Sequence, residues 1–270
     1  MIGGMGGAAD GLRRVRVGPE VPDELRRLWR LSAPSRLGRP AELDLERVVG
    51  AAVDLADRGG LAGASLPKVA RALGYTAMSL YRYVGSKDEL LCLMRDFAIG
   101  NPPKIATRPR EWRSGLRRWA CAERLLNERR PWLARLPIGG PPTGPHQIAW
   151  IETALRVLRG SGLDWAQKLG LISLISGYVR YASLLSHDLA RGRDGTGIDE
   201  PQAAQRYGRS MATLVDPSRF PEAARLFASD VFQASRRRAG VDPTADPDFS
   251  FGLERILDGA AAAIARARVR

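Results

Sequence analysis

The sequence predicts an all-α protein with two helical domains, and three observations lead to this fold class. The chain has 270 residues, which suits one large domain or two modest ones. From residue 44 onward, apolar residues recur every three or four positions, as in amphipathic helices, and no segment alternates as a β-strand does. Proline- and glycine-rich breaks divide this pattern into helices of ordinary length. We therefore divide the chain into an N-terminal arm (1–40), a first helical domain (41–100) and a second helical domain (101–270).

The composition is that of a soluble globular protein, because 44% of the residues are hydrophobic and 26% are charged. Cys92 and Cys121 match no zinc or redox spacing, which favours a reducing compartment. The longest charge-free apolar run, 169–179, is far shorter than the roughly 18 residues of a membrane span. Residues 1–20 contain no apolar stretch of signal-peptide length. We expect a cytoplasmic protein that does not contact a membrane.

Residues 1–40 have the composition of a flexible basic arm. Glycine and proline alternate there with arginine, and only residues 23–31 allow a short helix. Two interpretations of the arm stay open, since its basic side chains suit either a DNA minor groove or a solvated tail. The arginines concerned are Arg13, Arg14, Arg16, Arg36 and Arg39.

The first two helices of the 41–100 segment have clear start and stop signals. An amphipathic helix begins after Asp44 and ends at the pair Gly59-Gly60. A shorter helix begins after Ser65, a good N-cap residue, and ends at Gly74. Because glycine readily adopts the left-handed conformation that helix C-termini often require, we expect a tight turn at Gly74.

Two more helices follow this turn. Thr76 is the expected cap of a third helix, which ends near Gly85. Ser86 and Glu89 then match a capping box, in which the serine side chain accepts the third helical amide and the glutamate accepts the serine amide. The fourth helix runs to the Asn101-Pro102-Pro103 break, where we place the domain boundary.

The 101–270 segment is expected to be helical, with proline- and glycine-rich breaks. Two of its helices, 164–190 and 249–267, carry long apolar faces, and a resemblance to a known family described below makes them the candidates for pairing with a second copy of the chain. The predicted helices cover residues 110–129, 131–136, 145–160, 164–190, 201–215, 221–236 and 249–267.

The order helix, tight turn, helix within residues 65–84 is that of a helix-turn-helix motif. In such a motif the second helix enters the DNA major groove with its N-terminal side chains against base edges. The third helix here carries many hydroxyl and guanidinium groups, which suit phosphates and bases. These side chains belong to Thr76, Ser79, Tyr81, Arg82 and Tyr83. Double-stranded DNA is therefore the expected partner.

The stretch from Val48 to Phe97, with the string LYRYVGSKDEL from Leu80 to Leu90, resembles the DNA-binding domain of the tetracycline-repressor (TetR) family of bacterial transcriptional regulators. The 101–270 segment is similar, more loosely, to the ligand-binding domain of that family. The resemblance implies a homodimer that binds a palindromic operator and is released by a small-molecule effector. It also implies DNA contacts by Ser65, Lys68, Thr76, Ala77, Met78, Ser79, Tyr81, Arg82, Tyr83 and Lys87.

Side-chain chemistry agrees with most of these roles. Lys87 would add its charge to a helix N-terminus, where free amides already favour a phosphate. Ala77 and Met78 cannot donate or accept hydrogen bonds to bases in the usual way, so readout there must be apolar, for example against a thymine methyl. For Tyr81 and Tyr83, packing in the core is the alternative to DNA contact.

Aromatic side chains concentrate beyond the domain boundary. Such side chains between helices suit a cavity for an apolar or aromatic effector, and packing in the core is the alternative for each of them. The candidate ligand-binding residues are Trp112, Trp119, Trp132, Trp150, Tyr178 and Tyr181. Tetracycline-binding members hold a drug-bound magnesium ion with a histidine whose counterpart would lie in residues 136–140, which contain none. We therefore expect no metal, no other cofactor and an effector other than tetracycline.

No catalytic motif is present, since the sequence lacks a Gly-x-Ser-x-Gly elbow and a Walker phosphate loop, and we expect no enzyme. The net charge of +13 favours a polyanionic partner, although the basic residues are spread along the chain. The primary hypothesis is a ligand-responsive transcriptional repressor. The alternatives are an activator or ligand-independent regulator of the same fold, and a sequence-independent nucleic-acid-binding protein.

Overall fold

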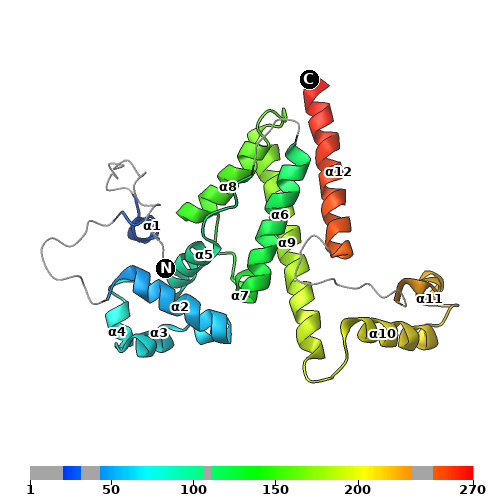
Figure 1. The fold of residues 1–270 in the computed structure, drawn as a ribbon, viewed down its shortest axis with the longest axis horizontal. Coiled ribbons are helices and arrows are strands. Elements are labelled where there is room, and N and C mark those ends of the chain that lie inside the picture. Colours follow the sequence, from blue (N-terminus) through cyan, green and yellow to red (C-terminus); the bar gives the residue numbers. More distant parts are fainter. Residues whose placement is uncertain (1–20, 32–42, 106–110, 233–245, 270) are drawn as a thin grey trace, which may run out of the picture.

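The structure is a computed structural model of the chain, and it describes residues 21–31, 43–105, 111–232 and 246–269. Within these ranges there are α-helices and short 3-10 helices but no strand, which confirms the all-α fold class. Figure 1 shows a compact group of N-terminal helices beside a second group of longer helices.

The N-terminal domain is built around α2 (Leu45–Gly59). Asp44 accepts the amide of Arg47 at 2.8 Å and begins this helix as expected. Against the buried face of α2 pack the 3-10 helix η1 (Leu61–Gly63), α3 (Leu66–Leu73) and α5 (Lys87–Ile99), while the short α4 (Ala77–Leu80) packs on α3. The common core consists of fully buried aliphatic side chains, among them Val48, Val49, Val69, Leu80, Leu90 and Met94.

The described part of the N-terminal arm is folded onto this domain. Residues 23–28 form α1 (Asp23–Leu28), and Leu28 is buried with only 5% of its surface exposed. Leu25 and Trp29 pack against the same core. This part of the 1–40 segment therefore belongs to the N-terminal domain instead of a free arm. Arg13, Arg14, Arg16, Arg36 and Arg39 lie outside the described residues.

The second domain is a bundle of longer helices. It contains α6 (Trp112–Arg129), α7 (Pro131–Arg135), α8 (Pro145–Val157), α9 (Trp165–Arg193) and α12 (Pro247–Val269). Helix α9 lies between α6 and α12 and contacts both (Figure 1). Their shared core includes Leu116, Trp119, Ile175, Val179, Leu253 and Leu257.

Ion pairs tie α12 to α6. Arg113 donates to Glu254 at 2.5 Å and to Asp258 at 2.6 Å, and Arg117 donates to Glu254 at 2.7 Å. Both arginines lie on the same helix as Trp112 and Trp119, next to the candidate ligand-binding residues. Because carboxylates of the chain itself balance their charges, they are not free to pair with an acidic ligand.

Helices α10 (Glu200–Leu214) and α11 (Pro221–Ala228), followed by the 3-10 helix η2 (Asp230–Phe232), extend away from the bundle (Figure 1). They form a small aromatic cluster of their own, in which the ring of Tyr207 lies edge-on to the rings of Phe227 and Phe232. The predicted helix 221–236 is thus shorter than expected, since α11 ends at Ala228, and residues 233–236 lie outside the described part.

Helix α9 is long and apolar enough to cross a membrane by length and composition alone. Such a helix is also the usual core helix of a soluble bundle, and Ile172, Ile175 and Val179 of α9 are buried in the core shared with α6 and α12. Other apolar side chains of α9 are exposed, among them Leu174 at 56%. Helix α9 thus has one face buried in the core and another, apolar face that is exposed.

Candidate functional site

The helix-turn-helix is formed by α3 and α4. Gly74 has a φ of +80°, the left-handed conformation expected from the sequence, and the amide of Tyr75 donates to the carbonyl of Ala70 at 2.9 Å. Val69 of α3 and Leu80 of α4 are fully buried in the shared core. This packing fixes the angle between the two helices and leaves the opposite face of α4 open.

The N-terminal end of α4 is accessible from solvent. The Thr76 hydroxyl caps the helix by accepting the amide of Ser79 at 3.4 Å, and it also lies 3.0 Å from the Ser79 hydroxyl. Met78 is the most exposed large apolar residue of the described chain, at 78%. An exposed thioether at this place gives an apolar contact, which suits a thymine methyl better than a base edge that requires hydrogen bonds.

The third helix is shorter than the sequence predicts. The α-helix ends at Leu80, and the amides of Tyr83 and Val84 both donate to the Leu80 carbonyl, so that the chain turns before Gly85. The two tyrosines differ in burial as a result. Tyr81 is 51% exposed, whereas Tyr83 is half-buried and packs against the core.

Basic and hydroxyl groups flank α4 on the neighbouring helices. Lys87 is exposed in the first turn of α5, directly after the N-cap Ser86, whose hydroxyl accepts the amide of Glu89 at 3.0 Å. Lys68 of α3 is exposed and donates to the carbonyl of Ala62 at 2.8 Å. Ser65 precedes α3 at the N-cap position, but its side chain makes no capping bond.

The expected capping box at α5 is formed only in part. Ser86 plays its role, but the Glu89 carboxylate accepts the amide of Gly85 at 2.8 Å instead of the amide of Ser86. The reason is tertiary, because Glu89 is also bound by the guanidinium of Arg27 from α1.

We expect Lys87→Ala to weaken binding to every DNA sequence by a similar factor, because the lysine is assigned to a phosphate. Removing one phosphate contact should flatten the slope of log K against log salt by about 0.9. Titrations of a fluorescent duplex at several salt concentrations measure this slope. Met78→Ala is the matched control, since it should change base preference and leave the slope intact. An unchanged slope in Lys87→Ala would place this lysine outside the interface.

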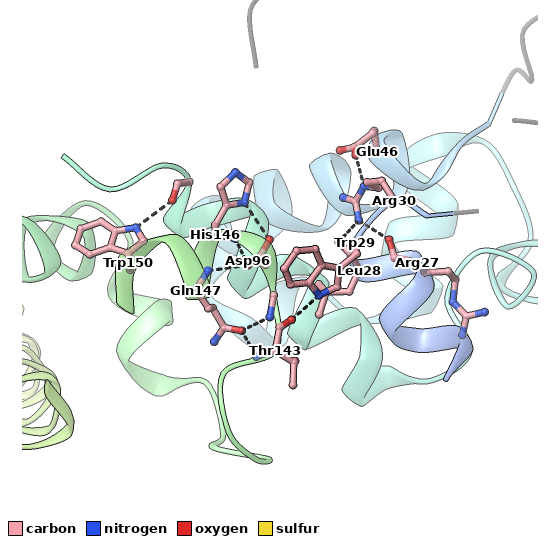
Figure 2. A network of polar contacts seen from close by, with 12 residues as sticks. Arg27, Leu28, Trp29, Arg30, Glu46, Asp96, Thr143, His146, Gln147 and Trp150 are labelled. Carbon is pink, nitrogen blue, oxygen red and sulfur yellow. Dashed lines mark hydrogen bonds and ion pairs between the residues drawn. The ribbon is translucent and has the colours of Figure 1, made fainter. Parts of the chain in front are cut away.

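A buried carboxylate joins the two domains (Figure 2). Asp96 of α5 is only 4% exposed and accepts the amides of His146 and Gln147, each at 3.0 Å. Its second oxygen lies 2.9 Å from Nδ1 of His146. Because these amides are the free donors at the start of α8, Asp96 caps a helix of the second domain from a helix of the first. Sequence reasoning missed this role, although an acidic residue next to the apolar series of α5 was a signal.

The predicted ligand-binding aromatic residues do not form one cluster, although four of the six lie in or against the core of the second domain. The rings of Trp119 and Trp150 are 6.1 Å apart, and their indole groups donate to the carbonyls of Trp150 and Gly100, each at 3.0 Å. Trp132, on α7, lies instead in the core of the N-terminal domain, and its indole donates to Asp57 at 2.6 Å. All three tryptophans are buried with their polar groups satisfied, which fits packing.

The other three candidates are spread over the second domain. Trp112 is half-buried at the edge of its core. Tyr178 stacks on Phe249 with 5.5 Å between ring centroids, and its hydroxyl donates to the carbonyl of Phe249 at 3.0 Å. Tyr181 is 63% exposed on α9. The described residues therefore show no single aromatic wall.

No pattern in the sequence indicates a role for Glu123, a half-buried acid of the second domain. It lies on α6, and its carboxylate accepts the hydroxyl of Ser176 of α9 at 3.0 Å. Burial raises the pKa of Glu123 from its ordinary value of 4.5 to about 7, and the serine hydrogen bond offsets only part of this rise. A carboxyl group among apolar helices costs stability when it is charged.

A cavity of about 450 Å³ lies between the segment after α5 and helix α8. Its lining contains none of the predicted aromatic residues and consists of Pro102, Pro103, Lys104, Ile105, Thr153 and Arg156. Across the part of the chain that the structure describes, no group of three or more His, Cys, Asp or Glu residues is placed to hold a metal ion.

The N-terminal domain carries a helix-turn-helix whose recognition helix is open to solvent. A buried contact joins this domain to a larger helical domain. This arrangement defines a DNA-binding regulator with a separate effector domain. Comparisons with known proteins agree. Residues 48–92 match the model of the bacterial regulatory proteins of the tetR family, and residues 106–264 match that of the tetracyclin repressor-like C-terminal domain. The chain belongs to the TetR family.

Individual relatives support the same assignment. The chain is 34% identical over 253 residues to the HTH-type transcriptional repressor DrrR1 of Streptomyces coeruleorubidus, covering 92% of this chain and 88% of the relative. It is 32% identical over 148 residues to the class E tetracycline repressor protein of Escherichia coli, covering 53% and 69%. Among solved structures, apo ActR from Streptomyces coelicolor superposes with a TM-score of 0.67 at 25% identity, covering 84% of this chain and 99% of ActR.

A second ActR structure, in complex with actinorhodin, superposes with a TM-score of 0.68 at 24% identity, covering 84% and 99%. The expected family and fold are thus confirmed, and the family is one of bacterial regulatory proteins. The family is one of transcriptional regulators and not of enzymes.

Proposed function

We propose that this protein is a homodimeric repressor that binds a palindromic DNA operator and is released from it by a small-molecule effector. The observation that carries the proposal is the contact of Asp96 with the start of α8, because it joins the helix next to the recognition helix to the second domain. Residues 41–100 serve as the DNA-binding domain and residues 101–270 as the ligand-binding and dimerisation domain.

The proposed DNA interface is the open face around α4. Met78 and Tyr81 supply exposed contact surface, and Lys87 stands at the free helix N-terminus of α5. The remaining members of the interface are Ser65, Lys68, Thr76, Ala77, Ser79, Arg82 and Tyr83.

The proposed dimer interface is the exposed apolar face of α9 together with α12. Two recognition helices must reach successive major grooves roughly 34–36 Å apart, which requires a two-fold axis. Exposed apolar patches of this kind mark association sites in proteins that are otherwise soluble. The exposed apolar side chains on these two helices are Trp165, Leu169, Leu174, Tyr181, Leu185, Leu189 and Phe251.

The proposed effector is an apolar or aromatic small molecule that binds without a metal. The complex of ActR with actinorhodin is a precedent for ligand binding by a protein of this fold. In this proposal the aromatic residues near the α6–α8 contact, Trp112, Trp119 and Trp150, line the site once the helices separate. The protein acts in the cytoplasm, where its operator is found.

The proposed function is tested with DNA selected by the protein from a random duplex library. Repeated selection should enrich a palindromic sequence, bound at least about 1,000-fold more tightly than random DNA at equal salt. Aromatic compounds, including actinorhodin, are then screened for release of this duplex. If a compound releases the duplex, the coupling should be reciprocal. The compound should lower the affinity of the protein for the operator, and the operator should lower its affinity for the compound, by the same factor of about 5 to 150. Equal affinity for selected and random duplexes would instead indicate a sequence-independent DNA-binding protein.

A further inference from the structure

Helix α1 and its C-cap residue Trp29 together contact both domains, although they lie outside the residues that match the two family models. Those models cover residues 48–92 and 106–264, whereas α1 spans Asp23–Leu28. Its last residue, Leu28, fixes it to the N-terminal domain and is only 5% exposed in the core. Polar side chains on either side of Leu28 then reach in different directions (Figure 2).

The first of these side chains, Arg27, binds the segment that follows the recognition helix. Its guanidinium donates to both oxygens of Glu89, at 2.5 and 2.9 Å. Glu89 is only 8% exposed and accepts the amide of Gly85 at 2.8 Å. A Cβ atom added at Gly85 would come within 2.9 Å of Glu89 and 3.2 Å of Arg27, so these two side chains lie directly against the turn after α4.

The second side chain, Trp29, binds the second domain. Its indole Nε1 donates to the carbonyl of Thr143 at 2.7 Å, across 114 residues of sequence (Figure 2). Thr143 stands just before α8, where the side chain of Gln147 accepts the amides of Thr143 and Gly144 at 3.4 and 3.2 Å. The same first turn of α8 is held by Asp96.

We propose that α1 is a strap that couples the turn behind the recognition helix to the start of α8, in parallel with Asp96. The inference rests on the proposed function, since it concerns how the effector domain and the DNA-binding domain move together. A displacement of α8 must either break the contact of Trp29 with Thr143 or pull α1, and with α1 the pair Arg27 and Glu89. Helix α1, which precedes the residues that match the family's DNA-binding domain, thus takes part in the coupling between the two domains.

Hydrogen exchange of the full-length free protein tests the strap, with peptides that cover the turn at 83–89 and the segment 141–148. Trp29→Phe keeps an apolar ring but removes the indole donor. It should raise exchange at both segments by about three-fold or more, because loosening one end of the strap loosens the other. Arg27→Met, which changes the opposite end, should produce the same two-ended result.

Arg26→Met is the matched control, because Arg26 lies on the same helix and its Nε donates to the nearby carbonyl of Val21. It should leave the exchange of both segments unchanged. If Trp29→Phe affects only 141–148 and Arg27→Met only 83–89, α1 consists of two independent local contacts and the proposal is wrong. Circular dichroism checks that each variant is folded. If Arg27→Met unfolds, Trp29→Phe alone still tests the proposal.

A second measurement adds the duplex selected by the wild-type protein. Bound DNA should protect the 141–148 segment in the wild type, and Trp29→Phe should reduce this protection by about half or more. Equal protection in both proteins would overturn the strap as a route between the domains. Failure to select any duplex would contradict the proposed function, whereas the exchange test on the free protein would still decide the strap.

Discussion

Glu123→Gln is expected to stabilise the protein by as much as about 3 kcal/mol at pH 8 and to have little effect near pH 4. The cause is the buried carboxyl on α6, whose pKa is raised by burial from 4.5 to about 7. Glutamine has nearly the same shape, carries no charge and still accepts the hydroxyl of Ser176. The variant therefore removes the cost of a buried charge without creating a cavity.

The sign of the pH dependence follows from the two protonation equilibria. Below pH 4.5 the carboxyl is protonated in both the folded and the unfolded protein, so it contributes no difference. Between pH 4.5 and 7 the unfolded chain loses the proton while the folded protein keeps it, and the free energy of unfolding falls as pH rises. Above pH 7 the whole penalty is present, about 1.4 kcal/mol for each pH unit between the two pKa values.

Denaturant unfolding at pH 4, 6 and 8 measures this effect. Glu152→Gln, on α8, is the matched control, because Glu152 is exposed and the same substitution there should leave stability nearly unchanged at all three values. A Glu123→Gln variant that is no more stable than the wild type at pH 8 would show that Glu123 is either solvated or paired with a cation.

Leu174→Asp is expected to convert the protein to a monomer and to weaken binding of the selected operator by about 100-fold or more. Leu174 is 56% exposed on α9 and belongs to the proposed dimer face. In a two-fold interface the substitution places one carboxylate on the contact face of each subunit, where it loses solvation without gaining a partner. A dimer gains affinity by binding two half-sites at once, whereas a monomer binds only one. This difference is why the expected loss of affinity is large.

Sedimentation velocity gives the oligomeric state, and titration of the selected duplex gives the affinity. Ile138→Asp is the matched control, because Ile138 is 71% exposed and lies in the segment after α7, outside the apolar faces of α9 and α12. This control should remain dimeric and bind the operator normally. A dimer that persists in Leu174→Asp would move the interface to another surface of the chain.

Most of the local structure was predictable, because its signals lie within a few residues of each other. The spacing of apolar residues predicted α2, α5, α6, α8, α9 and α12 with ends within a few positions of the observed ones. Asp44, Gly74 and Thr76 act at the helix ends where short-range capping chemistry placed them. The helix-turn-helix follows directly from these local elements and their order.

Side-chain partners that are distant in sequence were not predictable in the same way. Glu89 was expected to accept the amide of Ser86, but the approach of Arg27 from α1 turns it toward Gly85. Trp132 was grouped with the ligand domain by its position in the chain, yet it packs in the N-terminal core against Asp57. In both cases a helix from another part of the chain decides the contact.

The sequence alone therefore determined the fold class, the helix-turn-helix and the resemblance to the TetR family, because each depends on periodicity, capping or a contiguous motif. Only the tertiary structure decided that Trp29, at the end of α1, reaches the second domain, that Asp96 caps α8 and that Glu123 is half-buried against Ser176. The physical reason is that burial and hydrogen bonding depend on which surfaces meet. In the sequence, Asp96 is not distinguishable from other polar residues. Its role appears only when the free amides at the start of α8 lie 3.0 Å from its carboxylate.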